Sequence, residues 1–253
     1  MIFVAFAFGL WLGIKRGEKV GIKSSDIMDF TVWMMVSALI GARLTYVVTH
    51  WSEYAAHPLD AISPIQSDGT IGIAGLVVLG GVLFAIPTAY YFAKRRHIPY
   101  FKLTDVMIPS LAFGLGIGRI GCFLNGCCFG LPTELPWGVI FPSTCLAGSV
   151  YPHNPIHPTQ IYDLLYNFAI GFVLLWWTSK KRFQGELFFL FLGMYGFGRF
   201  LVENLRYYPD AGKLFALAGL QFTGSGLVSL AMSATGIYLF IKGREKKAKH
   251  AKR

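Results

Sequence analysis

Long apolar stretches with few charged residues recur along this chain and leave little choice of fold class. A helix needs about 20 consecutive apolar residues to cross the hydrocarbon core of a bilayer. Soluble helices instead mix apolar and polar residues with a period near 3.6, and soluble domains contain about 25% charged residues. This chain contains 14%. We therefore predict an integral membrane protein rather than a soluble domain.

The apolar stretches predict an all-α fold with about seven transmembrane helices and a small outer cap. The predicted spans are residues 1–14, 27–49, 70–93, 103–121, 159–178, 186–204 and 219–241. The first is short and begins at Met1 with no charged segment or cleavage site before it. We expect no signal peptide there, and we expect either that the start codon has been placed late or that an upstream stretch is missing.

Lysine and arginine are concentrated in alternate loops, which predicts the orientation because basic loops stay in the cytoplasm. The basic segments are residues 15–23, 94–102, 179–183 and the tail 242–253. We predict an outer N-terminus, a cytoplasmic C-terminus and a single membrane domain over residues 1–253. Its Pro- and Gly-rich segment 122–158 would form the outer cap. Anionic lipid headgroups explain the net charge of +10 better than nucleic acid does.

Charged side chains within the apolar stretches are candidates for function, because a charge at the bilayer centre costs about 2.5–3.5 kcal/mol on insertion scales. Arg43, Arg119 and Arg199 lie in predicted spans, and Glu203 and Arg206 follow Arg199 on nearly the same helical face. The topology puts the arginines in the outer halves of their spans. Grouped guanidinium ions suit a phosphate. The alternative is that each arginine only anchors its helix at the interface.

A second polar motif, "HPTQIYD" (157–163), enters the fifth predicted span. His157 and Asp163 are ionisable, Gln160 both donates and accepts hydrogen bonds, and Pro158 suits the start of a helix. A simple helix entry at the interface explains the motif by itself. Beside the arginines, it predicts the other wall of a polar cavity.

Three of the four cysteines lie in "GRIGCFLNGCCFG" (118–130). Cys122, Cys127 and Cys128 could pack as small apolar residues, form a disulfide among themselves or with Cys145, or bind a metal. No second His/Cys pair has the spacing of a zinc site. We therefore rank packing first, a disulfide second and a metal third, and we expect no metal and no other cofactor.

Six segments, in order and over nearly the whole chain, resemble the prolipoprotein diacylglyceryl transferases, which are enzymes of the bacterial inner membrane. They are "GARLTY" (41–46), "GRIGCFLNGCCFG" (118–130), "HPTQIYD" (157–163), "YGFGRFLVENLR" (195–206), "PDA" (209–211) and "LQFTG" (220–224). The family's core pattern is an arginine, a glycine, then Asn-Gly and a closing glycine. The matching residues are Arg119, Gly121, Asn125, Gly126 and Gly130.

The resemblance implies transfer of the diacylglyceryl group of phosphatidylglycerol to the lipobox cysteine of a prolipoprotein signal peptide, with release of glycerol 1-phosphate. It implies that Arg119 and Arg199 contact the phosphate or the transition state, that Glu203 orients Arg199, and that Asn125 shapes the site. It also implies a wider phosphatidylglycerol-binding set of Arg43, Arg206, Gly130, Tyr195, Asp163, His157 and Gln160. The acceptor thiol belongs to the substrate.

The sequence departs from the family pattern at three places. Ile73 occupies the position of a histidine that opens the third span in the family, and His57 lies well upstream. Cys122 replaces an asparagine, and the Tyr-Gly pair of the first span is absent. The base that takes the thiol proton would then be Glu203, Asp163, His157 or water.

Other functions are compatible with the same residues. A related enzyme with another lipid donor or acceptor would keep the arginines and lose the histidine. A lipid-binding protein without catalysis would also keep the arginines. A transporter is disfavoured because the sequence has no inverted repeat. The expected partners are phosphatidylglycerol, a prolipoprotein signal peptide and membrane lipids, and no nucleic acid.

Overall fold

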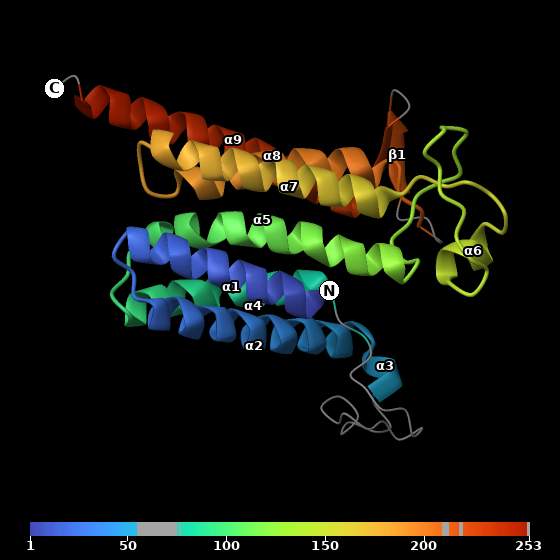
Figure 1. The fold of residues 1–253 in the computed structure, drawn as a ribbon, viewed down its shortest axis with the longest axis horizontal. Helices are drawn as coiled ribbons and strands as arrows, with labels where there is room; N and C mark the ends of the chain where they lie inside the picture. Colours follow the sequence, from blue (N-terminus) through green and yellow to red (C-terminus); the bar gives the residue numbers. More distant parts are fainter. Residues whose placement is uncertain (55–74, 76, 209–212, 218–219, 252–253) are drawn as a thin grey trace. The chain divides into compact units, whose positions relative to one another are not determined.

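A helix occupies most of each predicted span. The structure is a computed structural model that describes residues 1–253 except 55–74, 76, 209–212, 218–219 and 252–253 (Figure 1). The long helices are α1 (Ile2–Lys19), α2 (Ser24–Thr49), α4 (Val78–Arg95), α5 (Tyr100–Leu124), α7 (Thr159–Trp177), α8 (Glu186–Glu203) and α9 (Gly224–Ala251). Short helices are α3 (Trp51–Tyr54), α6 (Leu146–Val150) and the 3-10 helix η2 (Thr178–Lys180). The predicted helical character is confirmed.

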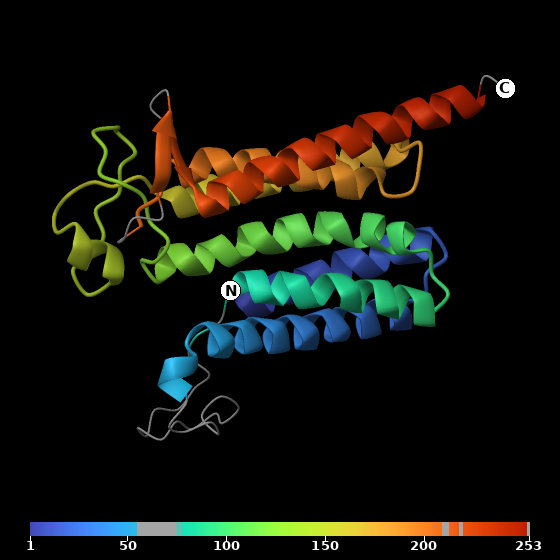
Figure 2. The same cartoon turned by 180° about the vertical axis from the view of Figure 1, so that it is seen from behind.

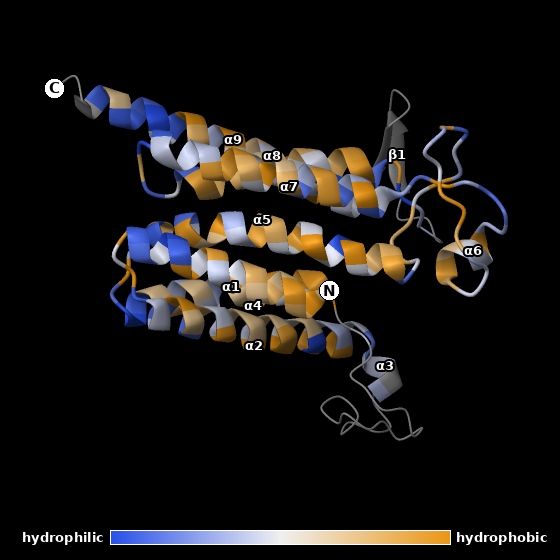
Figure 3. Cartoon of the chain, in the orientation of Figure 1, coloured by the Kyte–Doolittle hydropathy of each residue, from blue (hydrophilic) through white to orange (hydrophobic). Residues whose placement is uncertain are grey.

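Several helices have the length and composition that a bilayer requires. In the part of the chain that the structure describes, four are long and apolar enough to cross a membrane, at Ser24–Thr49, Tyr100–Leu124, Thr159–Lys180 and Gly224–Lys249. Figure 3 shows α9 changing from apolar to hydrophilic toward its C-terminal end. Helices satisfy their backbone hydrogen bonds internally, which lipid demands. The chain is a membrane protein.

Two short strands correct the prediction at the last span. β1 (Lys213–Leu217) pairs antiparallel with β2 (Leu220–Thr223), and α9 begins only at Gly224. The predicted span 219–241 therefore started too early, because a short segment that mixes apolar and polar residues does not by itself distinguish strand from helix. The predicted span 70–93 also started too early. Gly75 has a φ of +79° and Val77 is extended, so neither is helical.

The described chain divides into two compact units, which are Gly17–Leu103 and the combination of Met1–Arg16 with Thr104–Arg253. In the first unit, α2 and α4 pack along each other. The ring centroid of Phe92 lies 5.4 Å from that of Phe30 and 5.9 Å from that of Trp33. Arg96 forms an ion pair with Asp26 at 3.4 Å. These aromatic and ionic contacts hold the two helices together.

The second unit contains α5, α7, α8 and α9, with α7 beside α8 and α8 beside α9 (Figures 1 and 2). Its core is a buried cluster of Ile108, Ala112, Ile170, Leu174, Leu187 and Phe191. A Cβ atom at Gly116 would lie 2.6 Å from the Phe168 ring, so glycine is needed for this approach of α5 to α7. The same approach brings Arg119, less than a turn further along α5, up to α7.

The segment between α5 and α7 is a structured region with its own small core. Isolated bridges join Pro132 and Val139 to Ile156. The buried residues of this core are Phe129, Phe141, Ala147 and Ile156. It corresponds to the segment predicted as a cap.

Candidate active site

An ion pair between α5 and α7 joins two of the sequence motifs. Nε of Arg119 lies 3.0 Å from Oδ2 of Asp163, and the Asp163 side chain is 3% exposed. One turn along α7, the Asn167 amide donates to the Asp163 backbone carbonyl at 2.7 Å. A buried charge is tolerated when it is paired, so Asp163 fixes the position of the Arg119 guanidinium.

A second ion pair lies within α8. Nη2 of Arg199 is 2.7 Å from Oε2 of Glu203 and donates to the Tyr208 hydroxyl at 3.3 Å. The other carboxylate oxygen of Glu203 accepts hydrogen bonds from the hydroxyl groups of Thr223, at 3.0 Å, and Ser225. Glu203 is therefore ion-paired through one carboxylate oxygen and hydrogen-bonded through the other, and it holds one side of the Arg199 guanidinium.

The two ion pairs form one electrostatic group. Arg119 and Arg199 are close enough for each charge to act on the other, and Asp163 and Tyr195 interact with both arginines. The Tyr195 ring lies 6.1 Å from the ring of Tyr166 on α7. Two neighbouring guanidinium ions in partly buried surroundings attract an anion, because the protein screens their charge less than water does.

Buried polar atoms without a hydrogen-bond partner among the described residues surround these pairs. They include Gln160 Oε1, Asp163 Oδ1, the Tyr166 hydroxyl, Asn167 Oδ1 and Arg199 Nη1. An unsatisfied buried polar group costs about 1–3 kcal/mol, and more when it is charged. Nη1 of Arg199 is a charged donor. It is therefore the atom here that gains most from a bound anionic oxygen.

The loop that follows α5 is attached to the start of α7 through side chains. The hydroxyl of Thr159 donates to the Cys128 carbonyl at 2.8 Å. The amide of Gln160 donates to the Cys127 carbonyl at 2.7 Å. Both side chains are buried, so these bonds fix the backbone of the two adjacent cysteines. The predicted residue Gln160 therefore positions the loop that contains Cys127 and Cys128, which we call the cysteine loop.

Backbone pairing joins the same loop to the end of α8. Gly130 donates to the His157 carbonyl at 3.0 Å and forms an isolated bridge with Arg206, whose guanidinium lies 5.6 Å from the Tyr208 ring centroid. The imidazole of His157 contacts the Tyr162 hydroxyl at 3.1 Å. Partial burial lowers the pKa of His157. Gly130, His157 and Arg206 therefore border the cysteine loop.

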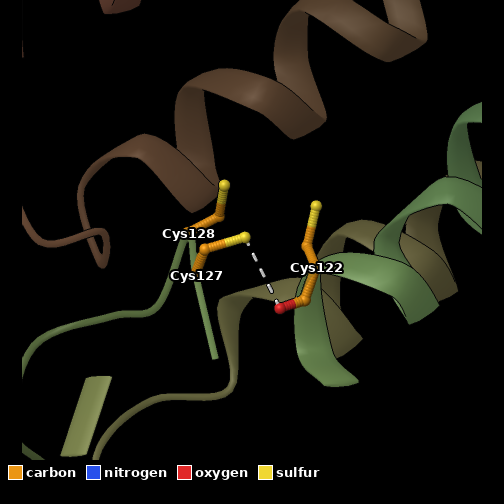
Figure 4. Close-up of side chains that lie close together, drawn as sticks. All are labelled: Cys122, Cys127 and Cys128. Carbon is orange, nitrogen blue, oxygen red and sulfur yellow. Dashed lines mark hydrogen bonds between the residues drawn. The ribbon is translucent and has the colours of Figure 1, made fainter. Parts of the chain in front are cut away.

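Cys122, in the last turn of α5, lies together with Cys127 and Cys128 of the loop (Figure 4). Their sulfur atoms are within 4.8 Å of one another, and the Cys127 thiol donates to the Cys122 carbonyl at 3.6 Å. A hydrogen bond with Cys122 lowers the pKa of the Cys128 thiol, and Arg206 and Arg119 lower it further against the effect of burial. All four cysteines are free, so the disulfide considered from the sequence is not formed.

Asn125 and Arg43 were also predicted as site residues. Asn125 is exposed just after α5, and its backbone N–H donates to the Gly121 carbonyl at 3.0 Å. Arg43 belongs to the unit Gly17–Leu103, where its guanidinium lies 5.2 Å from the Tyr54 ring centroid. Ile73, which departs from the family pattern, and the upstream His57 both lie outside the described residues.

Several residues of this region are not among those predicted from the sequence. Thr223 and Ser225 hold Glu203, Tyr208 contacts Arg199, and Asn167 follows Asp163 by one turn. A polar side chain that recurs one turn after a buried carboxylate could have identified Asn167. The signal for Thr223 and Ser225 was weaker, because they lie about 20 residues from their partner.

Comparison with known proteins is consistent with these contacts. Residues 1–242 match the family model described as prolipoprotein diacylglyceryl transferase. A phosphatidylglycerol–prolipoprotein diacylglyceryl transferase of Bordetella avium is 36% identical, over 95% of this chain and 87% of the relative. One of Clostridium tetani is 32% identical, over 89% of this chain and 84% of the relative. The chain therefore belongs to the prolipoprotein diacylglyceryl transferase family.

Proposed function

We propose that this chain transfers the diacylglyceryl group of phosphatidylglycerol to the lipobox cysteine of a prolipoprotein signal peptide. Family membership and the names of the relatives support the reaction. The site supports it through its charge, because the donor lipid and the leaving group both carry a phosphate. The products are a thioether on the lipoprotein and glycerol 1-phosphate.

We place the reaction in the bacterial inner membrane. The seven long helices would be seven spans, with the N-terminus outside and the C-terminus in the cytoplasm. The alternation of basic loops supports this orientation. In that orientation Arg119 and Arg199 lie toward the outer leaflet, where an exported prolipoprotein presents its signal peptide.

The observation that carries the proposal is the buried donor Nη1 of Arg199, which has no partner among the described residues and lies near a second arginine. Nη2 is held by Glu203, so the guanidinium is fixed with Nη1 available to an anionic oxygen. Asp163 holds Arg119 at Nε. Both arginines then bind the phosphate of phosphatidylglycerol through their remaining N–H groups.

The reaction consists of one bond formed and one bond broken. The thiolate of the lipobox cysteine attacks the glyceryl carbon, the new bond is C–S, and the C–O bond to the phosphate breaks. Charge grows on the phosphate as that bond breaks. Arg119 and Arg199 stabilise this charge more strongly in the transition state than in the bound lipid.

The other predicted residues take supporting roles. Glu203 orients Arg199, and Asp163 orients Arg119. Arg206, Tyr195, His157 and Gln160 line the path of the headgroup. Gly130 and Asn125 shape the loop, and Arg43 contributes a further contact to the anionic lipid.

The test is transfer in proteoliposomes that contain phosphatidylglycerol, with a lipobox peptide whose mass is followed. We expect the wild-type chain to add one diacylglyceryl group to the peptide cysteine. Arg119→Ala and Arg199→Ala should each lower the rate by about 100-fold or more, since each removes a charged donor from the transition state. The matched control is Arg95→Ala, which removes an exposed arginine of α4.

Near-normal transfer by both site variants would contradict the phosphate-binding role of the arginines. An unmodified peptide, with the lipid consumed in favour of another acceptor, would instead assign the chain to a related transferase. Lipid binding without turnover of either substrate would indicate a lipid-binding protein.

A further inference from the structure

The cluster of three sulfur atoms has no role in the proposed reaction of the arginines with the lipid phosphate. The Sγ atoms of Cys122, Cys127 and Cys128 lie within 4.8 Å of one another, and the group contains no histidine or carboxylate. A tetrahedral zinc ion, with Zn–S bonds of about 2.3 Å, holds its sulfur ligands about 3.8 Å apart. Closing the cluster around an ion therefore requires movements of about 1 Å or less, which rotation about the Cα–Cβ bonds can supply.

We propose that Cys122, Cys127 and Cys128 bind one zinc ion through three thiolates and that the open fourth position binds the thiol of the lipobox cysteine. The inference rests on the proposed function for the identity of that thiol. Three protein ligands with one open position are the arrangement of catalytic rather than structural zinc. Soft thiolate ligands favour zinc over magnesium or calcium, which prefer oxygen.

The backbone of the loop is shaped to bring the three sulfurs together. Cys122 lies in the last turn of α5, and the Cys127 N–H donates to its carbonyl at 3.1 Å. Gly126 and Cys128 have φ values of +64° and +60°. A positive φ is unfavourable for a residue with a side chain and costs on the order of 1 kcal/mol or more. Without such a turn, consecutive side chains of an extended chain point in opposite directions.

Contacts outside the sulfur cluster hold the loop in this shape. Thr159 and Gln160 donate to the carbonyl groups of Cys128 and Cys127. Hydrogen bonds around the ligands are what keep metal sites in order, and their loss typically lowers metal affinity by about 10–100-fold. The cluster therefore has both the ligands and the supporting contacts of a built site.

The charges around the cluster suit a metal with three thiolates. Zinc with three thiolate ligands has a net charge of about −1, and a fourth thiolate makes it more negative. Arg119 interacts electrostatically with Cys122, and both Arg206 and Arg119 do so with Cys128. These guanidinium ions offset the negative charge. Since Arg119 also binds the phosphate in the proposed function, the substrate thiolate and the lipid headgroup would meet beside the same residue.

A bound zinc ion would explain how the substrate thiol loses its proton. Glu203 is engaged by Arg199, Thr223 and Ser225, and Asp163 is paired with Arg119. A thiol that coordinates zinc is deprotonated on binding. The thiolate then attacks the glyceryl carbon, the C–O bond breaks, and the proton released to water is taken up by the departing phosphate monoester. No oxidant or reductant is required.

Metal binding is tested on the purified full-length protein in detergent, reduced with a phosphine and loaded with Zn²⁺ alone. We expect elemental mass spectrometry to find about one zinc ion per chain. Cys122→Ser, Cys127→Ser and Cys128→Ser should each reduce retained zinc by about 10-fold or more, since each removes a ligand. Cys145→Ser, which removes a free cysteine outside the group, should retain it.

Cobalt substitution tests the fourth position. Co²⁺ in the site should give intense sulfur-to-cobalt absorption, and a lipobox peptide should change that spectrum. The same peptide with serine in place of its cysteine should not. A folding defect in a cysteine variant does not affect this measurement, because it is made on the wild-type chain.

Activity separates the zinc proposal from the proposed function. Chelation of zinc should lower transfer by about 100-fold or more, and added Zn²⁺ should restore it. Transfer at full rate by the metal-free chain would overturn the zinc inference and leave the function standing. Binding of zinc and of the peptide without any transfer would support the zinc site and contradict the proposed function. Failure of the reduced wild-type chain to retain zinc would also overturn the inference, as would finding the three cysteines oxidised to a disulfide in the active enzyme.

Discussion

The side chains of Arg119 and Arg199 are held through different nitrogen atoms, and this difference determines which nitrogens are left for a ligand. Arg119 uses Nε for its ion pair with Asp163, so its terminal nitrogens take no part in that contact. Arg199 uses Nη2 for both Glu203 and Tyr208, which leaves Nη1 buried without a partner among the described residues. A guanidinium fixed at one nitrogen loses little freedom when a phosphate binds to the others. Each carboxylate therefore acts by positioning an arginine.

At the residue scale, His157 predicts a dependence of stability on pH. Partial burial lowers the pKa of His157 in the folded chain below its unfolded value of about 6.5. The unfolded chain then binds the proton more readily, so this contribution to stability is present above pH of about 6.5 and is lost as pH falls through the window below it. His157→Gln should remove that part of the pH dependence.

The measurement is the melting temperature in detergent between pH 7.5 and 5.5. The wild-type chain should lose more stability over this range than His157→Gln does. His153→Asn is the matched control, because His153 is exposed and asparagine tolerates its positive φ. Equal slopes for the wild type and His157→Gln would contradict the prediction.

At the scale of the helices, the start of α8 is fixed by a carboxylate from α5. Oδ2 of Asp105 accepts the Gly185 N–H at 2.8 Å and pairs with Lys181 at 3.1 Å, and Oδ1 accepts the Phe188 N–H at 3.1 Å. The Asp105 side chain is 1% exposed. A helix N-terminus favours a negative charge. Asp105 therefore caps a helix that belongs to another part of the sequence.

Replacement of Asp105 should destabilise the fold without removing the chemistry. Asp105→Ala leaves the buried N–H groups unpaired, and it should lower the free energy of unfolding by about 3–5 kcal/mol. The variant molecules that still fold should transfer the diacylglyceryl group at the wild-type rate per folded molecule. Asp105 and Arg119 are 14 residues, or about 21 Å, apart along α5.

Thermal unfolding in detergent checks this prediction. Asp29→Ala is the control, because it removes a carboxylate that pairs with Arg96 at the surface and whose side chain is 46% exposed. Such a pair contributes about 1 kcal/mol or less. A similar loss of stability in both variants would show that the Asp105 cap on α8 stabilises the fold no more than a surface ion pair does.

At the scale of the whole molecule, the basic segments predict how the chain crosses the membrane. The tail 242–253 should lie in the cytoplasm, and the segment 122–158 should lie outside. Green fluorescent protein fused to the tail should fluoresce, and alkaline phosphatase fused there should be inactive. Alkaline phosphatase fused after Glu134 should be active. The opposite pattern of activities would reverse the proposed orientation.

The sequence by itself determined which segments form long helices and which polar residues interrupt them. Span length and apolar content are local properties, so α2, α5, α7 and α8 begin and end within a few residues of the predicted spans. The motif "GRIGCFLNGCCFG" was also recognisable, because a charged residue such as Arg119 is costly in lipid. The local pattern was misleading at β2, where Leu220–Thr223 form a strand rather than the start of α9.

Only the tertiary structure decided which of these residues touch. Asp163 meets Arg119 across two helices, and Thr223 reaches Glu203 from 20 residues away. The sulfur atoms of Cys122, Cys127 and Cys128 converge because two residues of one loop take a positive φ and the start of α7 holds that loop. Such contacts depend on how closely helices pack and where loops are attached. Packing and loop attachment are set by many side chains together, so no short pattern in the sequence encodes them.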